Sequence, residues 1–306
     1  MPDMPDTSDT TATAVAPGGV IHDIGYRHYD GPRLGQGAVM RSLIADGIRG
    51  AYGIGRSKRS RIIPFLLLAF ACIPALIWGL VVTIINLDEL PVGYTEYVTI
   101  IQVLVAIFVA SQAPMLVSRD LRHRVVSLYF SRPLGRMQYV FARYAALSVA
   151  LFAFIATPVT LLFACALLAK LPIGEQLPDY LRGLANAALV ALLVSGIALV
   201  IAAFTVRRGL GVAAIITVLL LSTGLQAFVA IVAEEAGADM LEEWAAAISP
   251  FGLVDSINGH VLRGESTFMG VDPSWAMGAA FTGIWLTLVA GCWIVLALRY
   301  RKVGVS

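Results

Sequence analysis

The stretch IIPFLLLAFACIPALIWGLVVTII, residues 62–85, contains no Asp, Glu, Lys, Arg or His. A hydrocarbon core about 30 Å thick needs roughly 20 apolar residues in a helix. A helix also satisfies its own backbone hydrogen bonds, which lipid cannot do. The stretch is therefore predicted to cross a membrane, with Pro64 and Pro74 kinking the helix without ending it.

Five further stretches of similar length share this absence of charge, and Pro114 and Pro158 are expected to kink two of them. They cover residues 98–117, 145–169, 184–206, 210–233 and 276–298. The whole chain is 58% hydrophobic and 14% charged, whereas soluble domains are about 25% charged. The predicted fold class is an all-α, polytopic membrane helical bundle with six transmembrane helices in residues 62–306.

The charged residues are distributed unequally between the two ends of this bundle. The net charge is only +2, but 19 of the 22 Lys and Arg, with seven acids, lie before the first span, in the second and fourth connections, and after the last span. The alternate connections hold three Lys and Arg and thirteen acids. Because Lys and Arg are retained on the cytoplasmic side, both termini are predicted to be cytoplasmic.

The segment before the first span divides into two parts. Residues 1–36 are expected to form a cytoplasmic tail, with about the first twenty disordered, because they lack both apolar runs and the apolar region of a signal peptide. In residues 37–61, Met40, Leu43, Ile44 and Ile48 recur at helical spacing beside charged positions. This pattern predicts an interfacial amphipathic helix.

The connections between the spans also differ in length. Residues 118–144 form a long cytoplasmic loop, and residues 234–275 form the one long extracytoplasmic loop. In the latter, Met240, Leu241 and Trp244 lie at helical spacing, so a short helical cap is expected on the outer face. The Ser249-Pro250 pair is expected to break it.

Motifs for catalysis and cofactor binding are absent from the sequence. The nearest approach to a phosphate-binding loop, GIGRSKRS at 53–60, lacks the required spacing, and there is no G-x-S-x-G, H-E-x-x-H or C-x-x-C. The predicted spans contain no acidic, basic or histidine side chain of the kind that marks ion-coupled carriers. We therefore expect no enzymatic activity, no metal and no cofactor in this chain.

The second and fifth predicted spans, residues 98–117 and 210–233, contain all the amide side chains of the six spans apart from Asn186. One interpretation is that these residues hydrogen-bond between helices, at about 0.6 kcal/mol each. The other is that they line a translocation path. The candidate path residues are Gln102, Ser111, Gln112, Ser222, Thr223 and Gln226.

The long cytoplasmic connection reads SRDLRHRVVSLYFSRPLGRMQYVFARYAAL, from residue 118 into the third span at residue 147. It combines a basic amphipathic element, an SRPLGR turn and a helix that re-enters the membrane. The positive-inside rule accounts for its arginines. It does not account for Asp120, the Tyr129-Phe130 pair or the Pro133-Leu134-Gly135 turn.

Here the sequence resembles the permease subunits of the ABC-two class of ABC transporters. In that class an acidic residue near the end of the second span precedes a helix, an R-P-x-x-R-x-x-Y turn and a basic residue that opens the third span. The corresponding residues are Asp120, Arg132, Pro133, Arg136, Tyr139 and Arg143, where the family commonly has Lys at the last position. The segments YRHYDGPRLG (26–35) and ISPFGLVDSINGHVLRG (248–264) extend the likeness.

The resemblance implies a half-transporter of the exporter class in the bacterial plasma membrane. The predicted path is apolar with a few amides and hydroxyls, which favours a hydrophobic or amphiphilic substrate. The half-transporter would pair with a second permease copy, as a homodimer or with a related chain, and with two ATPase subunits that hold ATP and Mg. Membrane lipids surround it, and no nucleic acid partner is expected. The loop would act as a coupling helix, with the ATPase contact at Ser118, Arg119, Asp120, Arg122, His123 and Arg124, and with the return shaped by Arg132, Pro133 and Arg136.

Two other functions remain open at this stage. A secondary carrier or facilitator would need a coupling group or an inverted repeat, and neither is visible in the sequence. A non-transporting membrane anchor subunit of a larger complex fits the basic loop but leaves the polar residues of the second and fifth spans without a task. A neighbouring reading frame with a Walker A motif would favour the ATP-driven permease over both.

Overall fold

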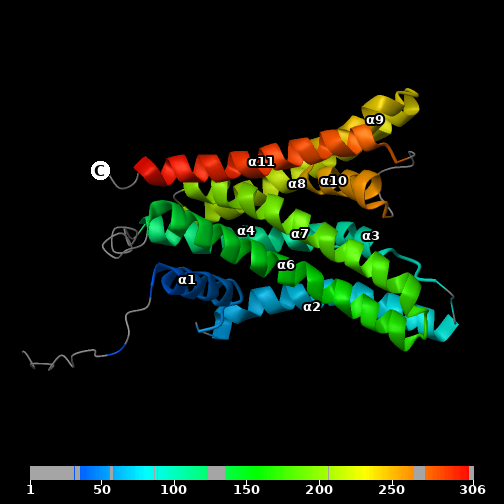
Figure 1. Cartoon of the computed structure of the whole chain (residues 1–306), viewed down its shortest axis with the longest axis horizontal. Coiled ribbons are helices and arrows are strands. Elements are labelled where there is room, and N and C mark those ends of the chain that lie inside the picture. Colours follow the sequence, from blue (N-terminus) through cyan, green and yellow to red (C-terminus); the bar gives the residue numbers. More distant parts are fainter. Residues whose placement is uncertain are drawn as a thin grey trace, which may run out of the picture. The chain divides into compact units, whose positions relative to one another are not determined.

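The computed structural model describes residues 31, 35–55, 58–85, 87, 89–122, 135–205, 207–264 and 273–302, excepting the side chains of residues 118–122 and 302. In chain order the helices are α1 (Gln36–Ala51), α2 (Lys58–Ile85), α3 (Tyr94–Ile100), α4 (Gln102–Arg122), α6 (Arg136–Leu168), α7 (Ile173–Phe204), α8 (Arg208–Glu235), α9 (Asp239–Ala245), the 3₁₀ turn η1 (Ala246–Ile248), α10 (Pro250–Ile257), the π turn η2 (Asn258–Leu262) and α11 (Trp275–Lys302) (Figure 1).

The prediction of an all-α fold with several helices long and apolar enough to cross a membrane is confirmed. Helices make up 88% of the described residues, and no strand occurs among them. Within these ranges, α2, α6, α7, α8 and α11 are each long and apolar enough to cross a membrane. The count reaches the predicted six when α3 and α4, which meet at an angle of 60°, are taken as one broken span.

The sharp bend in the second span lies at Ile101, where the sequence contains no proline. Pro64, Pro74, Pro114 and Pro158 all lie inside continuous helices. Tyr97, on α3, is fully buried, and its hydroxyl donates to the Ala71 carbonyl and accepts the Ala75 N–H at 3.0 Å. In an uninterrupted helix these two backbone groups would bond to each other, so the Tyr97 hydroxyl is inserted into α2 next to Pro74.

Two helices begin well before the charge-free stretches that predict them. Helix α6 starts at Arg136, and α7 starts at Ile173 after a tight connection in which Lys170 has φ = 64°. The early turns carry polar residues such as Gln138 and Asp179. A charge-free stretch marks the part of a helix that lies in hydrocarbon, whereas the helix itself continues into the polar layer on either side.

Helix α1 lies across α6 and α4 rather than apart from the bundle. Leu43, Gly47 and Ala51 form its buried face. The chain then turns through Tyr52, whose hydroxyl donates to the Ala150 carbonyl of α6 at 2.9 Å. Burial raises the pKa of Tyr52 to about 12, so the hydroxyl remains a donor at physiological pH.

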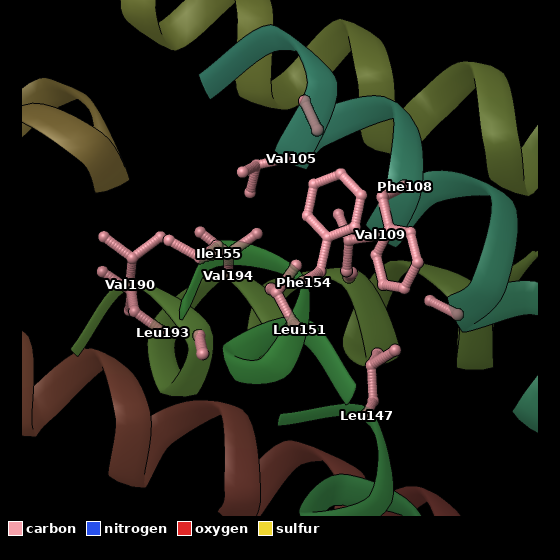
Figure 2. Packing of buried hydrophobic residues seen from close by; sticks show 14 of the residues in the cluster. Val105, Phe108, Val109, Leu147, Leu151, Phe154, Ile155, Val190, Leu193 and Val194 are labelled. Atoms are coloured by element: carbon pink, nitrogen blue, oxygen red, sulfur yellow. The ribbon is translucent and has the colours of Figure 1, made fainter. Parts of the chain in front are cut away.

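The core of the bundle is formed by α4, α6 and α7 (Figure 2). Phe108 of α4 stacks on Phe154 of α6, with ring centroids 4.4 Å apart, beside aliphatic residues of α7 such as Leu193. Helix α7 is the central helix, because 61% of its most apolar stretch is buried, against 22% in α2 and 17% in α8. The outer faces of α2 and α8 are apolar and exposed, as expected for helices in contact with lipid.

Candidate functional site

The two ends of the bundle are distinguished by α1. The side-chain amide of Gln138, in the first turn of α6, lies 3.4 Å from that of Gln36 at the start of α1, so these two helix ends share one end of the bundle, called here the α1 end. Helix α6 is 33 residues long, about 50 Å, so its connection to α7 lies at the opposite end, called the far end.

The start of α6 is fixed to α11 at the α1 end. Nη1 of Arg136 donates to the Arg301 carbonyl at 3.1 Å, and the rings of Tyr139 and Tyr300 lie 5.4 Å apart. Together with the Gln138 contact, these interactions join three helices around the point at which the predicted coupling loop enters α6.

One turn further along α6 is a buried cation. Arg143 is only 6% exposed, its guanidinium lies 5.3 Å from the centroid of the Tyr139 ring, and its Nε donates to the Tyr139 hydroxyl at 3.3 Å. A buried charge is tolerated only where aromatic rings and hydrogen-bonding groups replace water. Arg143 and Tyr139 are two of the residues on which the family resemblance rests.

The predicted ATPase-contact residues lie at the end of α4, at the start of α6 and between them, where residues 123–134 are not described. Ser118, Arg119, Asp120 and Arg122 belong to the last turns of α4, and Arg136 is the first residue of α6. His123, Arg124, Arg132 and Pro133 lie outside the described residues.

Two of the predicted path residues on α4 form hydrogen bonds within their own helix. Helices α4 and α8 pack against each other. On α4, Ser111 donates to the Phe108 carbonyl at 2.8 Å, Gln112 donates to Ser111 at 3.0 Å, and the side-chain oxygen of Gln102 is buried. No hydrogen bond between the polar side chains of α4 and those of α8 occurs in the described part of the chain.

The α8 residues contact a different element, α10. Oγ1 of Thr223 lies 3.2 Å from Oγ of Ser249, the N-cap of α10, while Ser222 bonds to Leu219 in its own helix. Gln226 is 2% exposed and its amide lies against Gly252, where an added Cβ would be 2.3–2.5 Å from the amide atoms. The side-chain oxygen of Gln226 has no hydrogen-bond partner among the described residues.

Residues 249–262 therefore form a re-entrant segment. The expected short helix with Met240, Leu241 and Trp244 is α9 (Asp239–Ala245), and Ser249, which precedes Pro250, is extended, as the predicted break at this pair requires. Thr223 precedes Glu235, the last residue of α8, by twelve positions, which places Ser249 about 18 Å inside the far end. Every residue of α10 is buried, including Asp255. The apolar run Phe251–Val254 is compatible with this position, but eight helical residues are too few to predict a span.

A second set of contacts holds the re-entrant segment to α9 and α11. His260 is 2% exposed; its Nδ1 accepts the Ser274 N–H at 3.0 Å, and its Nε2 lies 3.0 Å from Oε1 of Glu243. Nε2 of His260 and Oε1 of Glu243 are within ion-pair distance but form no hydrogen bond with each other. Phe281 of α11 stacks on the imidazole, with centroids 5.9 Å apart.

This pair is the feature that the sequence interpretation missed. Both residues lie in the predicted extracytoplasmic loop, because no long charge-free stretch contains them. Within the described ranges, no group of three or more His, Cys, Asp or Glu side chains is placed to hold a metal ion.

Comparison with known proteins gives no match for this chain, either among protein-family models or among curated proteins.

Proposed function

We propose that this chain is the membrane-spanning permease subunit of an ATP-binding cassette transporter that exports a hydrophobic or amphiphilic substrate. ATP is hydrolysed in a separate ATPase subunit present in two copies, and a second permease copy completes the complex. The α1 end faces the cytoplasm of a bacterial cell, and the far end faces outward.

The observation that carries this proposal is the set of contacts at the start of α6. The loop between α4 and α6 is the most basic connection of the chain, and it enters α6 where Arg136, Gln138 and Tyr139 contact α11 and α1. A push on this loop is therefore transmitted to three helices at once. Such rigid-body displacement is how force from outside the bilayer moves a packed bundle.

The far end supports the same proposal, because it contains an element suited to act as a gate. The re-entrant segment reaches about 18 Å into the bundle and contacts α8 through Thr223 and Gln226, two of the predicted path residues. Its withdrawal would expose hydroxyl and amide groups within an otherwise apolar passage. A passage of this composition suits amphiphilic molecules better than ions.

The test is a double charge reversal, Arg122→Glu with Arg124→Glu, in the complex purified from its native host. We expect an ATPase subunit to co-purify with the unaltered chain, and the double variant to lose permease-stimulated ATP hydrolysis. Arg207→Glu is the matched control, because this exposed arginine lies at the α1 end in the short connection before α8. Unchanged stimulation in the double variant, or the absence of any ATPase subunit, would remove the proposal.

A second candidate is favoured by ionisable residues in and beside the re-entrant segment. Asp255 and the pair of Glu243 and His260 are the kind of groups that ion-coupled carriers retain. In that case the chain alone, in proteoliposomes with a proton gradient and no ATPase, would transport its substrate. The permease proposal predicts no transport under those conditions.

A further inference from the structure

A charged pocket of about 380 Å³ opens at the far end, apart from the predicted path. It lies between the connection before α3, the first turns of α7 and the end of η2. Its charged lining residues are Glu89, Glu175, Asp179, Arg182 and Arg263. A volume of this size is within the range of small-molecule sites.

The pocket lies at the depth of lipid headgroups. The charge-free stretch of α7 begins at Leu184, so Arg182 lies about 3 Å and Glu175 about 14 Å beyond the hydrocarbon boundary. The polar layer on each side of the hydrocarbon is several ångströms thick. The pocket therefore extends across this layer.

The first turns of α7 present two different faces. Glu175, Gln176, Asp179 and Arg182 line the pocket, whereas Ile173, Leu177 and Leu181 are 59%, 43% and 54% exposed on the other side. Gly183 lets α3 approach closely, because a Cβ there would lie 2.7 Å from Cβ of Tyr94, which also lines the pocket. The charged pocket and the exposed apolar residues therefore lie on opposite faces of the same helical turns.

The two signs of charge within the pocket are partly separated. Asp179 is paired with Arg182, and the guanidinium of Arg263 lies 5.7 Å from the centroid of the Trp275 ring. Glu89 and Glu175 have no ion pair with another described residue. With three carboxylates and two guanidinium groups, the lining carries a net charge of −1.

We propose that this pocket binds the headgroup of a zwitterionic phospholipid with a primary amine, such as phosphatidylethanolamine. Its ammonium group is recognised by Glu89 and Glu175, and its phosphate by Arg182 and Arg263. The acyl chains extend from the headgroup toward the charge-free part of α7, which begins at Leu184. This site is independent of the proposed transport function and of which leaflet the far end occupies.

The charges also determine which lipids are excluded. A trimethylammonium group has no N–H to donate to the carboxylates, so phosphatidylcholine loses the charge-assisted hydrogen bonds. Phosphatidylglycerol has no ammonium group, and its net negative charge is repelled by the net −1 of the lining.

The experiment is native mass spectrometry of the purified full chain mixed with equal amounts of the three lipids. We expect retention of phosphatidylethanolamine at least about tenfold above phosphatidylcholine. Glu89→Gln with Glu175→Gln should reduce its retention to the phosphatidylcholine level. Glu234→Gln with Glu235→Gln is the matched control, since it removes two exposed carboxylates outside the pocket and should have no effect.

Three outcomes would overturn the proposal. Equal retention of the ethanolamine and choline lipids would show that the amine is not recognised. Equal effects of the two double variants would show that the lipid does not bind in this pocket. Binding of water-soluble glycerophosphoethanolamine as tight as that of the lipid would identify a free phosphoamine, and not a lipid, as the ligand. Thermal unfolding of each variant, compared with the unaltered chain, verifies that lost retention does not reflect lost folding.

Discussion

At the residue scale, Tyr97 of α3 is the clearest case of a side chain that hydrogen-bonds to backbone groups of another helix, here α2. Pro74 cannot donate a backbone hydrogen bond, so the hydrogen-bond ladder of α2 is interrupted at the residue before Ala75. The Tyr97 hydroxyl donates to the Ala71 carbonyl and accepts from the Ala75 N–H. The sequence predicts the defect at Pro74, but not the residue that repairs it, because Tyr97 is distant in the sequence and reaches α2 only in the folded bundle.

Tyr97→Phe is expected to destabilise the protein by about 1–3 kcal/mol, because it leaves the Ala75 N–H and the Ala71 carbonyl buried without a partner. Tyr94→Phe is the control on the same helix: its hydroxyl bonds to Gln176 at the edge of the charged pocket, where water can replace it. The measurement is the midpoint of thermal unfolding in detergent for both variants. Equal midpoints for the two would show that α2 closes its own hydrogen bond when the hydroxyl is absent.

At the element scale, the sequence predicts the long helices well and the re-entrant segment poorly. Each predicted span contains a long charge-free stretch, and such a stretch in lipid has few alternatives to a helix. Helix α10 has only eight residues, and its burial depends on contacts with Thr223 and Gln226 of α8. In the same way, the motif in residues 132–143 predicts that a helix re-enters the membrane there, whereas the contacts of α6 with α11 depend on the tertiary fold.

Ser249→Ala is expected to loosen α10. Ser249 caps the helix by accepting from the N–H groups of Phe251 and Gly252, and it also contacts Thr223. Loss of an N-cap costs about 1 kcal/mol, or roughly fivefold in the equilibrium between closed and open forms. Hydrogen exchange at the α10 amides should accelerate by about this factor.

Ser222→Ala serves as the control for that measurement, because its hydroxyl bonds only to a carbonyl of its own helix. Exchange in α10 should be unchanged in this variant. Acceleration in both variants alike would mean that α8 as a whole, and not the cap, determines the stability of the segment.

At the scale of the whole molecule, α11 connects the two candidate regions. At the α1 end it contacts α6 through Tyr300 and the Arg301 carbonyl, and near the far end Phe281 stacks on His260 and lies 5.4 Å from the Trp244 ring. Phe281 and Tyr300 are separated by about 29 Å along this helix. A single rigid helix therefore joins the entry of the proposed coupling loop to the proposed gate.

The last prediction tests whether the gate must move for the complex to turn over. Thr223→Cys with Ser249→Cys, in a chain whose three native cysteines are replaced by alanine, places two thiols where oxygen atoms now lie 3.2 Å apart. This spacing allows a disulfide. Oxidation should fix the re-entrant segment to α8, so ATP hydrolysis by the purified complex should fall to the rate of the ATPase subunit alone and recover on reduction. Ser222→Cys with Ser249→Cys, one position away on α8, should not cross-link, and undiminished hydrolysis by the fully cross-linked complex would show that the segment does not act as a gate.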